Sequence, residues 1–195
     1  DALARAARLA DTLLPTVLAQ IEHVRRTAGL VEPRTVREWG DRLTMLDGLR
    51  TTLDVFQPMI FERTAAGLVA ATADARTRRE THDDMTALQR RRLVKQAKDM
   101  LRPGTRVPDL HAALVEVQAQ REAWTAVCPG GGWPILPDGL ADMEQTWDEL
   151  VADLDALAAV LATTPAGADL LDTPRDDLVA RLRALADDRE ALDHL

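Results

Sequence analysis

The stretch LADMEQTWDELVADLDALAAVL, residues 140–161, decides the fold class of this chain. Its apolar side chains recur at alternating spacings of three and four residues, through Leu140, Met143, Trp147, Leu150, Leu154, Leu157 and Leu161. A heptad seam of this kind predicts a helix, from about Asp138 to Thr163, that packs along a partner helix in coiled-coil fashion. No strand-like alternation of apolar and polar residues competes with this period elsewhere in the 195 residues.

The same helical period continues on both sides of this seam, interrupted by prolines and glycines. Pro15 should kink or split the first helix, Gly29 should end it, and the polar run Thr77–Asp84 should be a loop or mobile link. The run CPGGGWPILPDG, from Cys128, is the strongest helix-breaking segment. The other predicted helices span approximately Ala2–Ala28, Pro33–Gln57, Met59–Ala75, Asp84–Arg102, Asp109–Val127 and Pro174–Leu195.

Composition agrees with helices. Aromatic residues make up 3 % of the chain and Tyr is absent, so the core must be built from Leu, Ala and Val. Short connections between long helices favour antiparallel neighbours. We therefore predict an all-α fold: an elongated antiparallel helical bundle with coiled-coil-like packing and about seven helices. Both ends of the chain begin or stop in helical periodicity, so we expect a single domain excised from a longer polypeptide.

Charge divides the chain into three segments. Residues 1–75, the N-terminal helices, carry 9 basic and 10 acidic side chains, and residues 76–106, the basic link and helix, carry 10 and 4. Residues 107–195, the acidic C-terminal helices, carry 5 and 18, so the net charges are −1, +6 and −13. The overall net charge of −8 therefore conceals a strongly basic middle.

The basic helix is the one candidate binding site. Arg91, Lys95, Lys98 and Arg102 recur at i, i+4, i+7 and i+11 and should line one face, while apolar residues face the other way. A helix with a docked apolar face and a free basic face can contact phosphates through its cations. No aromatic residue lies among these cations, so we expect no base stacking on this helix. The predicted nucleic-acid-binding residues are Arg90, Arg91, Arg92, Lys95, Lys98, Arg102 and Arg106.

A second interpretation of the same residues is structural. The basic stripe can be a solvated helix face, or it can lie against the acidic C-terminal helices of the same fold. The two interpretations differ in whether the cations are exposed or neutralised by carboxylates. The sequence leaves both open.

No catalytic or metal-binding constellation is visible. The four histidines, His23, His82, His111 and His194, are far apart, and none forms an i, i+4 pair with another His or with Cys128. The glycine-rich PGGGWP segment lacks the Gly-Lys-Ser/Thr ending of a phosphate-binding loop, so we expect a sharp turn with Trp133 tucked into the bundle. We assign no catalytic, cofactor-binding or metal-binding residue.

Three segments resemble a known family when taken together. They are LDVFQPMIFERTAAGLVAATA from Leu53, RRRLVKQAKDMLRPGTRVPDLHAALVEVQAQREAW from Arg90 and CPGGGWPILPDGL from Cys128. The succession resembles a helical accessory region of large superfamily-one helicase-like ATPases from high-GC bacteria. The resemblance implies a parent chain with Walker motifs that uses ATP and Mg²⁺. Neither Walker motif is present in this sequence, so no cofactor is expected in this fragment.

The leading hypothesis is an accessory stalk or insertion domain of such an ATPase. It would contribute a sequence-independent contact with the backbone of DNA or RNA, or couple to the ATPase core of the same parent chain. The rival hypothesis is a protein-interaction or oligomerisation scaffold, such as a homo-oligomer, in which the 140–161 seam meets a partner helix. The lone cysteine fits a reducing cytoplasm. The sequence contains no run of about 18 apolar residues, so we predict no membrane span.

Overall fold

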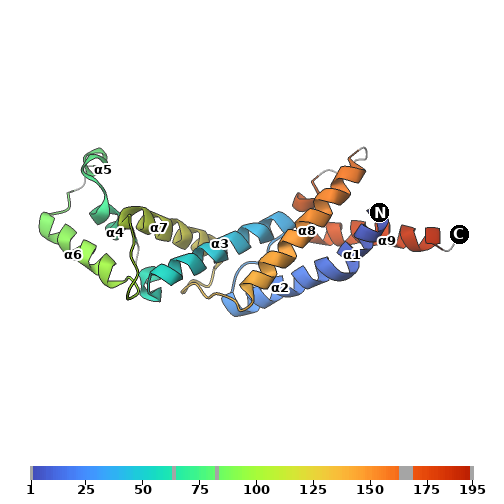
Figure 1. The fold of residues 1–195 in the computed structure, drawn as a ribbon, viewed down its shortest axis with the longest axis horizontal. Coiled ribbons are helices and arrows are strands. Elements are labelled where there is room, and N and C mark those ends of the chain that lie inside the picture. Colours follow the sequence, from blue (N-terminus) through green and yellow to red (C-terminus); the bar gives the residue numbers. More distant parts are fainter. Residues whose placement is uncertain (1, 63–64, 82–83, 163–168, 194–195) are drawn as a thin grey trace. The chain divides into compact units, whose positions relative to one another are not determined.

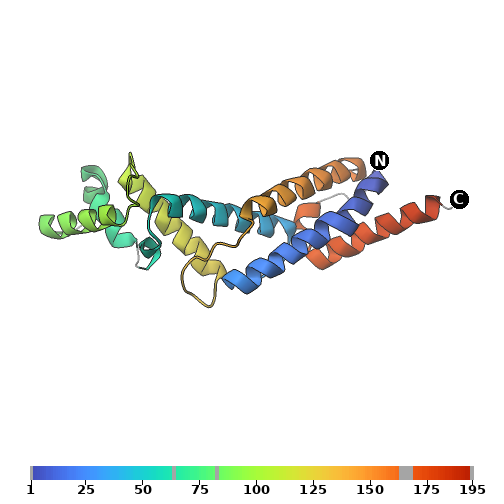
Figure 2. The same ribbon diagram turned by 60° about the horizontal axis from the view of Figure 1, so that its bottom comes forward.

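A computed structural model of the chain describes residues 2–62, 65–81, 84–162 and 169–193, with side chains described as far as residue 187. The fold is all-α, as predicted (Figures 1 and 2). Two isolated β-bridges, Thr35–Pro174 and Phe56–Leu101, are the extended pairings in the described ranges, and neither forms a strand. The chain folds as two compact units: unit 1 comprises residues 1–44 and 137–195, and unit 2 comprises residues 45–136.

Unit 1 contains the two ends of the chain. Its elements are α1 (Ala2–Arg8), a π-helical turn η1 (Leu9–Leu13), α2 (Leu14–Ala28), the start of α3 (Val36–Val55), α8 (Leu140–Leu161), a 3₁₀ turn η4 (Leu170–Asp172) and α9 (Arg175–Asp193). The predicted ends at Thr163 and Leu195 lie outside the described residues.

The first predicted helix changes its winding just before Pro15 and does not break there. Pro15 has no N–H to donate, and its ring opposes the carbonyl four residues earlier. The chain accommodates this with the π-helical turn Leu9–Leu13, which stands directly before α2 and joins it to α1. Gly29 ends α2 as predicted: its φ is 69°, and its N–H donates to the carbonyl of Arg25 at 3.0 Å.

The 140–161 seam is the centre of unit 1. Leu150, Leu154 and Leu157 are fully buried, and α8 packs against α1, η1 and α2 (Figures 1 and 2). Arg8 donates to Glu149 and Asp153 near the middle of α8, whereas Gln20, later along the N-terminal helices, donates to Thr146, which is nearer the start of α8. These pairs run in opposite directions along the two elements, so their packing is antiparallel. Coiled-coil geometry along this seam stays a prediction.

Two ion pairs tie the start of α3 and the loop before it to the start of α9 and the turn η4 before it. Arg175 donates to Glu32 at 2.6 Å, and its backbone N–H donates to the carbonyl of Arg34 at 2.9 Å. Arg37 donates to Asp172 at 2.6 Å, and this hydrogen bond holds the pKa of the Asp172 carboxyl below its ordinary value. Both pairs are at the surface, where a single ion pair contributes little to stability.

Unit 2 is built from one continuous stretch of chain. Its elements are the end of α3, a 3₁₀ turn η2 (Pro58–Phe61), α4 (Ala66–Thr72), α5 (Ala75–Glu80), α6 (Ala87–Asp99) and α7 (Leu110–Val127). Its core is formed by apolar side chains from α3, η2, α4, α6 and α7. They include Leu46, Leu49, Phe56, Ile60, Leu68, Ala97, Leu114, Val117 and Trp124.

Two predictions in this region were wrong. The stretch Met59–Ala75 is not one helix, because Pro58 starts a 3₁₀ turn that ends at Phe61 before α4 begins. The polar run Thr77–Asp84 is not a loop throughout, because its first half belongs to α5. The Asp74 carboxylate caps α5 by accepting from the N–H of Thr77 at 2.7 Å, which lowers the pKa of Asp74. His82 and Asp83 lie outside the described residues.

A buried polar pair joins α3 to α7 inside unit 2. The Thr52 hydroxyl donates to the side-chain carbonyl of Gln120 at 2.7 Å, and the Gln120 amide donates to Glu116 at 3.0 Å. Thr52 and Gln120 are both buried, so the Thr52 hydroxyl and the Gln120 side-chain carbonyl have each other as hydrogen-bond partners in place of water. The absence of a side chain at Gly48 leaves room for the Gln120 amide. A Cβ at this position would lie 3.2 Å from the Gln120 side-chain nitrogen, which is closer than an ordinary van der Waals contact.

The glycine-rich run after α7 is an irregular connection, as predicted, but Trp133 is not tucked into the fold. Gly131 and Gly132 both have positive φ, and the Cys128 thiol donates to the carbonyl of Gly131 at 3.4 Å. Cys128 itself is buried, together with Trp124 at the end of α7, whereas the Trp133 side chain is 42 % exposed. The turn thus directs this ring outward.

Candidate nucleic-acid interface

Local signals define both ends of the basic helix α6. Thr86 and Gln89 form a capping box: the Thr86 side chain accepts from the Gln89 N–H, and the Gln89 side chain accepts from the Thr86 N–H. The helix ends at Asp99, three residues before the predicted end at Arg102. The chain then turns back to the end of α3, where the backbone N–H of Arg102 donates to the carbonyl of Val55 at 2.9 Å.

The apolar face of α6 is docked, as its pattern predicts. Ala97 and Met100 are buried, and the helix packs against α4. Leu93 and Val94 are half-buried on the same side. This packing leaves the opposite face of a short, well-capped helix exposed on unit 2.

Four of the seven predicted binding residues share that exposed face. They are Arg91, Arg92, Lys95 and Lys98. Within the described ranges, none of the four forms an ion pair, although the carboxylate of Asp99 is exposed on the same helix. Four cations without ion pairs therefore lie within about two helical turns. They form the basic face that the sequence predicted for this helix.

The other three predicted residues lie elsewhere. Arg90 is turned toward α4, where its guanidinium donates to the carbonyl of Ala70 at 3.3 Å. Arg102 lies beyond the end of α6, so it is not the fourth member of a helical row, and its Nε donates to the carbonyl of Leu53. Arg106 is exposed on the connection between α6 and α7. The candidate surface on α6 itself therefore consists of the other four cations.

Sequence reasoning missed two features beside this surface. Arg78 and Arg79 belong to α5, a helix that the sequence could have revealed through its Asp74 cap and the i, i+4 pair of Arg76 and Glu80. Leu88, in the first turn of α6, is 79 % exposed, although it had no assigned role.

The acidic C-terminal segment does not neutralise α6 within unit 2. Of the 18 acidic residues in the segment 107–195, three belong to unit 2: Asp109, Glu116 and Glu122. Each of them accepts a hydrogen bond from a residue of α7 itself. Unit 2 as a whole holds 13 basic and 11 acidic residues, a net charge of +2, against −10 for unit 1.

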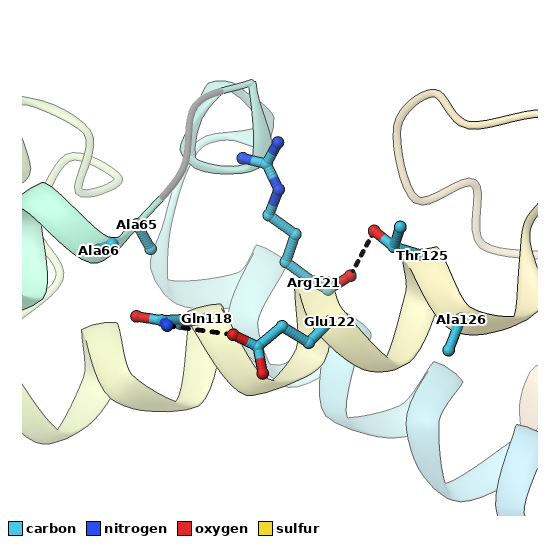
Figure 3. A pocket seen from close by; sticks show the side chains of 7 residues that line it. All are labelled: Ala65, Ala66, Gln118, Arg121, Glu122, Thr125 and Ala126. Carbon is cyan, nitrogen blue, oxygen red and sulfur yellow. Dashed lines mark hydrogen bonds between the residues drawn. The ribbon is translucent and has the colours of Figure 1, made fainter.

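A hollow of about 460 Å³ lies between the start of α4 and α7 (Figure 3). Ala65 and Ala66 line one side, and on α7 the Gln118 amide donates to the Glu122 carboxylate at 3.0 Å. The Arg121 Nη1 atom is buried and has no hydrogen-bond partner among the described residues. The lining is largely apolar, and among the described residues it pairs no nucleophile with a general base.

A second hollow, of about 480 Å³, runs beside α6 itself. Arg92, Gln89 and Gln96 line it together with Leu93, Met85 and the carboxylate of Asp84. It is wide open to solvent along the helix. Its position extends the α6 surface on the Arg92 side.

The histidines are the remaining candidates for catalysis or metal binding. The His111 Nδ1 atom lies 3.2 Å from both the Thr72 hydroxyl and the Val69 carbonyl at the end of α4. In the part of the chain that the structure describes, no three His, Cys, Asp or Glu side chains gather as metal ligands would. His82 and His194 lie outside that part.

Comparisons with known proteins leave this interface without a relative to interpret it: no family model, curated protein or solved structure matches the chain. Within the described ranges, none of the helices has the length and apolar character needed to cross a bilayer.

Proposed function

We propose that the chain is an accessory helical domain of a helicase-like ATPase and that it contacts the phosphate backbone of DNA or RNA through α6. Four exposed cations without ion pairs support the polyanion contact. The resemblance of three segments to helicase-like ATPases supports the parent class, whose core would bind ATP and Mg²⁺ and act in the cytoplasm. The accessory domain itself would neither bind nor hydrolyse ATP.

The observation that carries this proposal is the exposure of Arg91, Arg92, Lys95 and Lys98 without a carboxylate partner in the described ranges. Each cation that neutralises a phosphate releases a counterion, so affinity falls with salt in proportion to the number of contacts. Four contacts with a duplex give a slope of about −3.6 in log K against log salt, or about 150-fold weaker binding between ~50 and ~200 mM salt.

The test is a titration of fluorescent nucleic acid with the purified chain at both salt concentrations. The double variant Arg91→Glu/Lys95→Glu should abolish binding at the higher salt. Its matched control is Arg181→Glu/Arg183→Glu, which changes the net charge equally at two exposed positions of α9 and should bind like the native chain. Equal losses in both variants would show that net charge, and not α6, controls binding.

The rival scaffold function makes a different prediction in the same samples. Its seam on α8 is occupied, because Leu150, Leu154 and Leu157 are buried within unit 1 against the chain's own helices. A partner helix would have to displace these contacts. Absence of nucleic-acid binding, together with a dimer in sedimentation that Arg91→Glu/Lys95→Glu leaves intact, would favour the scaffold.

A further inference from the structure

The exposed face of α6 has two cationic flanks and a central ridge. At about 100° per residue, Arg91 and Lys98 lie on one flank, and Arg92 lies about 100–120° away on the other. Leu88 and Lys95, seven residues apart, lie between the flanks, about 20° from each other around the axis and about 10 Å apart along it. A flat row of charges along one strand would not need cations on both sides of the helix.

Leu88 is the unexpected member of this face. Its exposure of 79 % is the largest among the exposed large hydrophobic residues of the described chain. It contributes nothing to the core of unit 2, and phosphates would not select an apolar side chain. The edge of a base pair does offer an apolar partner: the thymine methyl group, which lines the major groove of DNA.

Single-stranded nucleic acid fits this surface poorly. Proteins that bind single strands stack bases on aromatic side chains. In unit 2 the aromatic residues Phe56, Phe61 and Trp124 are buried. Trp133, which is exposed, follows the far end of α7, whereas α6 precedes its start. The exposed residues of α6 include no aromatic ring.

Helix and groove dimensions select among duplexes. The major groove of B-form DNA is about 12 Å wide and admits an α-helix, whereas the major groove of A-form RNA is too narrow for side chains to read. The helix α6 lies at the edge of unit 2 in both views (Figures 1 and 2), and none of the described helices of that unit is drawn over its outer side.

We infer that α6 enters the major groove of duplex DNA, with Arg91 and Lys98 on the phosphates of one strand, Arg92 on those of the other, and Leu88 and Lys95 facing the base edges. This inference rests on the proposed nucleic-acid contact and narrows its substrate from any polyanion to the B-form duplex. The carboxylate of Asp99, at the last position of the helix, faces the same side and disfavours a further phosphate contact there.

The experiment compares three labelled probes of equal length, about 20 base pairs or nucleotides, close to two turns of a duplex. The probes are duplex DNA, single-stranded DNA and duplex RNA, each titrated with the full chain at ~50 and ~200 mM salt. The inference predicts tightest binding to duplex DNA. The salt loss should be about 150-fold for that probe, against about 50-fold for a single strand contacting the same four cations.

Two variants test the placement of the ridge. Leu88→Ala should weaken duplex binding about fivefold by removing apolar contact area, with the salt slope unchanged because no charge is lost. Val160→Ala removes methyl groups from another exposed side chain, on α8, and should bind like the native chain. Circular dichroism serves to check that both variants fold.

The outcomes separate the inference from the proposal beneath it. Binding to none of the three probes overturns both the proposed function and the inference. Single-stranded DNA or duplex RNA binding as tightly as duplex DNA overturns the inference and leaves the backbone contact standing. Duplex binding that Leu88→Ala does not change overturns the major-groove placement.

Discussion

Gly40 permits the close approach of α3 to α8 in unit 1, and replacing it should reveal how tightly these helices pack. A Cβ added at Gly40 would lie 2.4 Å from the Cζ2 atom of Trp147 and within 2.9 Å of two further ring atoms. Carbon atoms in contact stand about 3.5–4.0 Å apart, so the Trp147 ring must move. Gly40 is buried and Trp147 half-buried, so the ring can shift only part of the way toward solvent.

Two opposing terms set the size of the effect. Alanine in place of glycine inside a helix gains about 1 kcal/mol of helix propensity. Overpacking of this kind costs about 1–3 kcal/mol. We expect Gly40→Ala to destabilise unit 1 by about 1 kcal/mol, which corresponds to a fall of about 2–4 °C in Tm for a chain of this size.

The measurement is urea unfolding followed by circular dichroism, with amide hydrogen exchange in α8 to locate the change in unit 1. Gly67→Ala is the matched control, because no atom of the described residues outside its chain neighbours and its own helix backbone lies within 4 Å of a Cβ built there in α4, and it should stabilise by about 0.5–1 kcal/mol. In a Trp147→Ala background, Gly40→Ala should also become stabilising. The reasoning fails if Gly40→Ala stabilises the native chain as much as Gly67→Ala does.

Three further predictions follow from contacts in the two units. Thr52→Val should destabilise unit 2 by about 1–2 kcal/mol in urea unfolding, because it leaves the buried carbonyl of Gln120 without its donor; an unchanged midpoint would contradict this. Thr86→Ala should cost about 1 kcal/mol of α6 stability and raise its amide exchange, whereas Thr86→Asp keeps a cap acceptor and should not. The pKa of Asp172 is lowered by Arg37, so the stabilisation from this pair is present above the ordinary Asp pKa of about 3.9 and is lost as pH falls through the lower folded-state pKa. Acid titration of Asp172→Asn should lack that part of the pH dependence, and an unchanged profile would exclude the pair as its source.

The all-α fold could be predicted from the sequence because its signals are local. The spacing of Leu150, Leu154 and Leu157 marks a buried helix face, and Gly29 marks a helix end, without knowledge of any partner. Where the result depended on contacts distant in sequence, prediction was weaker. Beyond the end of α6, the N–H of Arg102 pairs with the carbonyl of Val55, and no local pattern reveals that partner.

The candidate site shows the same division. Alternation of charge and apolar residues predicted that Lys95 and Lys98 lie opposite the docked face of the helix, but it left open whether acidic helices cover them; both side chains are exposed. It could not predict that Arg90 turns to the carbonyl of Ala70, because that depends on α4 being adjacent. Helix α5 was missed for a different reason: a segment of six residues has too few apolar positions to show a period, and only its cap and one charged pair mark it.

The division of the chain has a consequence for the order of events during synthesis. Residues 45–136 emerge from the ribosome as one stretch and complete unit 2, whereas the first 44 residues must wait for residues 137–195 before unit 1 can close. Helix α3 crosses the boundary between the units, so its second half is packed in the nascent chain while the unit that contains its first half is still incomplete. We therefore expect the early apolar segments to be exposed for longest in translation, which makes them the natural targets for a holding chaperone.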